Sequence, residues 1–69
     1  MPYSSNAELP AAVQSHLPRH AQDIFRATFN SAFERYGGDE ARAFRIAWAA
    51  VKRRYVKTGQ RWVERPHVS

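Results

Sequence analysis

The stretch that decides the fold is AWAAVKRRYVK, Ala47 to Lys57, in which a tryptophan stands among small alanines and is followed by a run of basic residues. Taken as a helix at about 100° per residue, it and the residues before it gather large apolar side chains on one side: Phe44, Ala47, Trp48, Val51 and Tyr55. A neighbouring side gathers cations: Arg42, Arg45, Lys52 and Arg53. We therefore predict a helix that buries Trp48 and exposes its basic residues.

A second apolar stripe precedes this helix and matches it. Its members recur in steps of three and one, the spacing of one broad helical face: Ala21, Ile24, Phe25, Thr28, Phe29, Ala32, Phe33 and Tyr36. Gly37-Gly38 is expected to end this helix and Asp39 to cap the next one. Because the turn is short, the two helices should lie antiparallel, over residues 19–36 and 39–57, with Gly59 ending the second.

A short helix is expected before this helical hairpin, over residues 10–17. Pro10 suits a first helical position, and Pro18 should end the helix. Its apolar residues are spaced four apart: Leu9, Val13 and Leu17. We expect them to sit on a small apolar patch of the last helix that consists of Ala43, Ile46 and Ala50. The alternative is that this patch is an exposed docking face.

The two ends of the chain are predicted to meet. The segments PYS (2–4) and RWV (61–63) have an extended character and could pair as a two-stranded sheet. The predicted fold is thus mainly α, a compact three-helix domain spanning residues 1–69, with a small sheet that joins the termini. A chain of 69 residues is the size of one domain, and its aromatic content of 13% is ample for a small core.

Charge is distributed unevenly along the chain. Residues 1–40 carry three basic and five acidic residues, whereas residues 41–69 carry eight basic and one acidic residue, which together give the net charge of +5. A half this basic suggests an anionic partner, such as nucleic acid or an acidic protein surface. The candidate contact residues are Arg42, Arg45, Lys52, Arg53, Lys57 and Arg61. The alternative reading is a solvated surface without a partner.

No motif in the sequence indicates catalysis or a cofactor. Cysteine is absent, and the Gly37-Gly38 pair is not followed by the lysine and serine or threonine of a phosphate-binding loop. His16, His20 and Asp23 are the candidates for a metal site, but Pro18 should break the helix that would bring the two histidines together. We therefore expect no metal, no cofactor and no enzymatic activity. No signal peptide or membrane-spanning segment is apparent, so a cytoplasmic location is expected.

Three segments carry a family resemblance: MPY at the start, LPAAVQSHLPRHAQDIFRATFNSAFERY (9–36), and AWAAVKRRYVK (47–57) followed by Trp62. This pattern resembles the ChaB family of small cation-transport regulators. The resemblance implies a bundle of three helices with a small flanking sheet. It also implies regulation of a membrane cation/proton antiporter through protein–protein contact. Some viral relatives are described as DNA-binding, and the alternative function is therefore that of a basic nucleic-acid-binding accessory protein.

This chain departs from the family pattern after Tyr36. The connection GGDEARAF (37–44) is short where a longer, strongly acidic insert is usual, and the tail is rich in arginine. A partner contact made through that insert would be missing here. The departure bears on the antiporter role more than on the fold.

Overall fold

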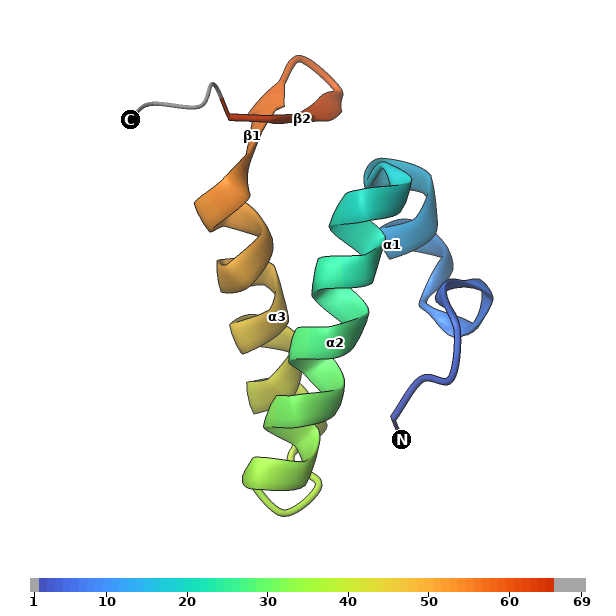
Figure 1. The fold of residues 1–69 in the computed structure, drawn as a ribbon, viewed down its shortest axis with the longest axis vertical. Helices are drawn as coiled ribbons and strands as arrows, with labels where there is room; N and C mark the ends of the chain where they lie inside the picture. The colour runs from blue at the N-terminus through green and yellow to red at the C-terminus, as the bar shows by residue number, and fades with distance from the viewer. Residues whose placement is uncertain (1, 66–69) are drawn as a thin grey trace.

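The computed structural model describes residues 2–65. Its elements in chain order are a 3-10 helix η1 (Asn6–Glu8), α1 (Ala11–His16), α2 (Arg19–Arg35), α3 (Glu40–Arg54), β1 (Tyr55–Thr58) and β2 (Arg61–Glu64). Helix α3 lies antiparallel along α2, and α1 packs on α2 from its other side (Figure 1). The predicted fold, three α-helices with a small two-stranded sheet, is confirmed.

The core forms where α2 meets α3. Phe25 and Phe29 of α2 are fully buried, and α3 contributes Ala43, Ala47 and Val51, each with no exposed surface. Full burial of a side chain of phenylalanine size stabilises a fold by about 1.5–3 kcal/mol. The small alanines occupy the closest approach of the two helices. The larger Phe44 and Trp48 of α3, which were predicted to be buried, are only half-buried at the edge of this core, where their rings pack edge-on against Phe25.

The connection between α2 and α3 agrees with the sequence. Gly37 and Gly38 have φ values of 66° and 87°, a region that residues with a side chain seldom adopt. The Asp39 carboxylate accepts a hydrogen bond of 3.1 Å from the backbone N–H of Arg42, which makes it the N-cap of α3. The predicted helical hairpin is therefore confirmed.

The prediction for the sheet was wrong in its partner strand, and α3 is shorter than expected. Helix α3 ends at Arg54, and Tyr55 begins a strand whose residues pair from Tyr55 opposite Glu64 to Thr58 opposite Arg61. Gly59, with φ of 64°, belongs to the two-residue turn of this β-hairpin and does not end the helix. Tyr55 and Val56 favour a strand because aromatic and β-branched side chains suit a pleated surface.

The amino-terminal segment is held by α2 instead of by a strand. The backbone N–H of Tyr3 donates to Oδ1 of Asn30, and Nδ2 of Asn30 donates to the carbonyl of Tyr3, both at 2.8 Å. The Tyr3 ring lies 4.8 Å from the ring of Phe29, and Arg26 donates to the carbonyl of Ser4. Side-chain hydrogen bonds thus replace the predicted strand pairing. Residues 66–69 of the predicted tail lie outside the described residues.

Helix α1 is not seated where the sequence suggested. Leu9, Val13 and Leu17 are buried as expected, but the helix packs on α2. Of the small patch that was expected to hold it, Ala43 is part of the α2–α3 core, whereas Ile46 and Ala50 line open hollows on the surface. The predicted patch is therefore divided, because Ala43 is buried between α2 and α3 whereas Ile46 and Ala50 lie outside that interface.

Asn30→Ala is expected to lower the free energy of unfolding by roughly 1–2 kcal/mol, since it removes two hydrogen bonds worth about 1 kcal/mol each. Urea denaturation followed by circular dichroism measures the loss. Hydrogen exchange should show that the Tyr3 amide, bonded to Asn30 in the parent, becomes unprotected. Ser31→Ala, at the next and exposed position, is the matched control. Unchanged stability together with a protected Tyr3 amide would refute this anchoring role.

Candidate functional site

The predicted contact residues fall into two groups. Arg42, Arg45, Lys52 and Arg53 are exposed on α3, as helical spacing predicted. Lys57 and Arg61 are exposed on the β-hairpin, one on each strand. We call the first group the α3 cations. All six positions are accessible to a partner; whether they bind one stays a prediction.

Arg42 has a defined place at the start of α3. Its guanidinium carbon lies 4.6 Å from the centre of the Tyr36 ring, in a cation–π contact. The spacing predicts Tyr36 on the apolar face of α2, but Tyr36 follows the end of that helix and its side chain is 40% exposed. An exposed aromatic ring and an arginine thus stand together at the Gly37-Gly38 end of the molecule.

Arg65 is a structural cation that the sequence reasoning missed. Its Nε donates to the carbonyl of Lys52 at 3.0 Å, and its backbone N–H donates to the carbonyl of Arg54 at 2.7 Å. These carbonyls belong to the last turn of α3, where no further helical partner is available. Arg65 therefore ties the end of the β-hairpin to the helix. Arg65 follows the end of α3 by eleven residues, so no local pattern in the sequence marks this contact.

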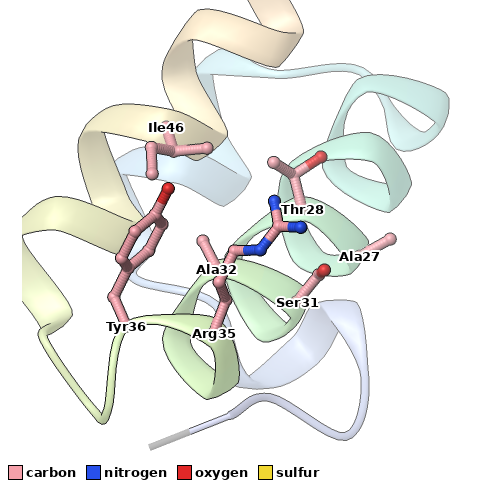
Figure 2. Close-up of a pocket in the computed structure, with 7 residues that line it drawn as sticks. All are labelled: Ala27, Thr28, Ser31, Ala32, Arg35, Tyr36 and Ile46. Atoms are coloured by element: carbon pink, nitrogen blue, oxygen red, sulfur yellow. The ribbon is translucent and has the colours of Figure 1, made fainter.

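A shallow groove follows the seam between α2 and α3. It consists of two open hollows of about 360 Å³ each, which share Thr28 and Ile46. The first hollow extends toward Arg35 and Tyr36, and Figure 2 shows the Arg35 side chain reaching over it toward Thr28. The second is completed by α3 residues: Ala49, Ala50 and Arg53. We call these two hollows together the α2–α3 groove.

The amino-terminal segment leaves this groove open. At about 100° per residue, Arg26 lies on nearly the opposite side of α2 from Thr28. Arg26 binds the carbonyl of Ser4, whereas Thr28 lines both hollows. The segment before α1 therefore covers one edge of the seam, and the groove occupies the other.

Shifted pKa values occur away from these surfaces. Burial raises the pKa of Tyr55 above its ordinary 10.0, and the nearby Glu64 carboxylate adds to the shift. Burial likewise raises the pKa of Tyr3, with a smaller contribution from Glu40. Both groups are structural, because Tyr55 belongs to the core and Tyr3 packs against Phe29. Neither is placed to act on a bound molecule.

The three candidate metal ligands have other contacts. Nδ1 of His16 lies 2.7 Å from the carbonyl of Ala12, and the His20 ring packs edge-on near Tyr55. Asp23 accepts a hydrogen bond from Asn6. Within residues 2–65, no cluster of three or more histidine or acidic side chains could hold a metal ion. In the same residues, no helix has the length and apolar character needed to cross a membrane.

Comparison with known proteins gives consistent matches. Residues 9–65 match the family model described as ChaB. A protein of Escherichia coli (strain K12) named "Putative cation transport regulator ChaB" is 44% identical over 66 residues, covering 83% of this chain and 87% of the relative. An uncharacterized protein from the LEF8-FP intergenic region of Lymantria dispar multicapsid nuclear polyhedrosis virus is 39% identical over 51 residues, covering 74% of this chain and 72% of the relative. The NMR solution structure of the putative cation transport regulator ChaB superposes with a TM-score of 0.84 at 37% identity, covering 94% of this chain and all of that one.

Proposed function

The chain belongs to the ChaB family, and from that premise we propose that it regulates a cation/proton antiporter through protein–protein contact made by its basic surface. The regulation of cation transport is supported by relatives that are named as cation transport regulators. The exposed α3 cations support the contact, because the core does not use them. In this proposal residues 1–69 act as one non-enzymatic module on the cytoplasmic face of the antiporter.

The exposed α3 cations carry this proposal, and a transport assay tests it. Cation/proton exchange is measured in inverted membrane vesicles of the source organism, with increasing amounts of added protein. The double variant Arg45→Gln/Lys52→Gln should need about tenfold more protein for the same change in exchange rate, which is the loss expected when about 1.4 kcal/mol of binding is removed.

A matched control distinguishes the effect of these two positions from the effect of a lower net charge. Arg19→Gln/Arg54→Gln removes the same charge from two other exposed positions and should act within about twofold of the parent. A parent protein that leaves exchange unchanged at every concentration would refute the regulatory role. Equal losses in the two variants would show that net charge matters and the proposed surface does not.

Nucleic-acid binding is the second candidate, and the excess of cations in residues 41–69 favours it. Binding that neutralises phosphates weakens steeply with salt, by about 0.9 in log K per log unit of salt for each contact. A mobility-shift titration with random duplex DNA should then show affinity that falls steeply between low and physiological salt. Lys57→Gln/Arg61→Gln should reduce the slope by about 2. No shift at high protein concentration would exclude this function.

A further inference from the structure

The α2–α3 groove has the dimensions of a helix-binding site. Thr28 and Arg35 are seven residues apart on α2, and Ile46 and Arg53 are seven apart on α3. At 1.5 Å per residue in a helix, the two hollows together extend roughly 20 Å. That length matches about four turns of a docked helix. Small side chains on the α3 wall, Ala49 and Ala50, leave room for its backbone to approach.

The groove combines apolar walls with two arginines. Ile46 is half-buried between the two hollows and Ala27 lines one of them. Among the described residues that line the groove, the charged ones are Arg35 in the first hollow and Arg53 in the second. Arginine binds carboxylates through two parallel hydrogen bonds, so these two positions favour an acidic ligand.

The exposed Tyr36 strengthens this assignment. Its ring lines the first hollow and is covered on one face by Arg42. Tyrosine and arginine are the residue types that most often dominate binding energy at protein interfaces. The carboxylate of Asp39, which lies at the same end of α3, is engaged as the helix cap.

We propose that the α2–α3 groove docks an acidic amphipathic helix of a partner protein, with its apolar face on Ile46 and its carboxylates on Arg35 and Arg53. This rests on the proposed action through protein contact and specifies the chemistry of the partner. A helix that docks in a groove is anchored by its apolar side chains, and the alanine, isoleucine and threonine side chains of this groove can contact them. The phosphate backbone of a nucleic acid has no such apolar side chains. Because cytoplasmic loops of membrane proteins are rich in lysine and arginine, an acidic segment is also a selective target.

The test uses a synthetic peptide and NMR. The probe is a capped peptide of about 14 residues, with leucine at i, i+3, i+4 and i+7 and glutamate on both flanks of that stripe, the pattern of a groove-binding helix. Added to the ¹⁵N-labelled full chain, it should shift the amides of Thr28, Ser31, Ile46 and Ala50 in a saturable way. Shifts confined to the β-hairpin, or no saturable shifts, would overturn the proposal.

Charge exchange decides whether the arginines act as proposed. Arg35→Glu/Arg53→Glu should bind the acidic peptide at least about tenfold more weakly, and should gain affinity for the peptide with lysine in place of glutamate. Arg19→Glu/Arg54→Glu makes the same change in net charge at exposed positions that neither line the hollows nor belong to the α3 cations. It should stay within about twofold of the parent. Equal losses in both variants, or groove shifts caused by duplex DNA and not by the peptide, would overturn the docking assignment.

The transport assay separates this inference from the proposed function. If Arg35→Glu/Arg53→Glu fails to bind the peptide but regulates exchange as the parent does, the groove is not the regulatory contact and the antiporter role stands. If the parent binds the peptide in the groove but never changes exchange, the docking site stands and the antiporter role is refuted.

Discussion

Phe25→Ala is expected to lower the free energy of unfolding by about 3–5 kcal/mol, the usual result of truncating a buried aromatic side chain. Phe25 has no exposed surface, and its ring centre lies 5.3 Å from that of Phe44 and 5.4 Å from that of Trp48. It therefore links α2 to the large side chains of α3. Since a small single core rarely provides more than about 3–5 kcal/mol in total, most of the variant should be unfolded at room temperature.

Two substitutions make this prediction specific. Val63→Ala truncates an apolar side chain that is 40% exposed on the β-hairpin and should change stability by less than about 0.5 kcal/mol. Phe25→Leu keeps most of the buried volume and should lose about half as much as the alanine variant. Circular dichroism during urea unfolding measures all three. If Phe25→Ala unfolded cooperatively at the urea concentration of the parent, the core described above would be wrong.

The helical part of the fold was predictable because its signals are local. Proline before each of the first two helices, two glycines and a capping aspartate after α2, and apolar stripes at helical spacing all lie within a few residues of the elements they specify. The antiparallel arrangement then follows from the short turn. The family resemblance pointed to the same architecture, and the superposition on the solved ChaB structure confirms it.

The end of α3 was predicted wrongly because one residue fits two patterns. Tyr55 continues the helical stripe of Trp48 and Val51, which suggested a longer helix. It is also the first of the strand-forming residues Tyr55-Val56 that precede the Gly59 turn. As a strand residue Tyr55 remains 4% exposed, so either assignment would bury it. The pairing of β1 with Arg61–Glu64 makes Tyr55 a strand residue, and the periodicity of the sequence does not reveal this pairing.

The two candidate surfaces differ in how well they can be predicted from the sequence. Exposure of the α3 cations follows from their angular position on one helix, which the sequence contains. The α2–α3 groove depends on how two helices meet and on which edge the residues before α1 cover. That edge is selected by Asn30, whose side chain binds the backbone of Tyr3. Helical spacing does not reveal a hydrogen bond between residues 27 positions apart, such as Tyr3 and Asn30. Ile46 and Ala50 were therefore predicted to lie under the short first helix.

Trp48→Ala is the second substitution with a large expected effect, about 3 kcal/mol. Trp48 is half-buried, which places the loss at the lower end of the range for tryptophan truncation. Its ring contacts Phe25 and Phe44 on one side and lies 5.8 Å from the Trp62 ring of the β-hairpin. The substitution should therefore loosen the β-hairpin as well as the helix pair.

A double-mutant cycle with Trp62→Ala measures that link. If Trp48 holds the hairpin against α3, the two substitutions together should be less destabilising than the sum of the single ones, with a coupling of about 0.5–1.5 kcal/mol. The single variant Trp62→Ala should also reduce hydrogen-exchange protection in β1 and β2 while leaving α2 protected. Strict additivity would mean that the hairpin is held by Arg65 and its backbone bonds to α3 instead.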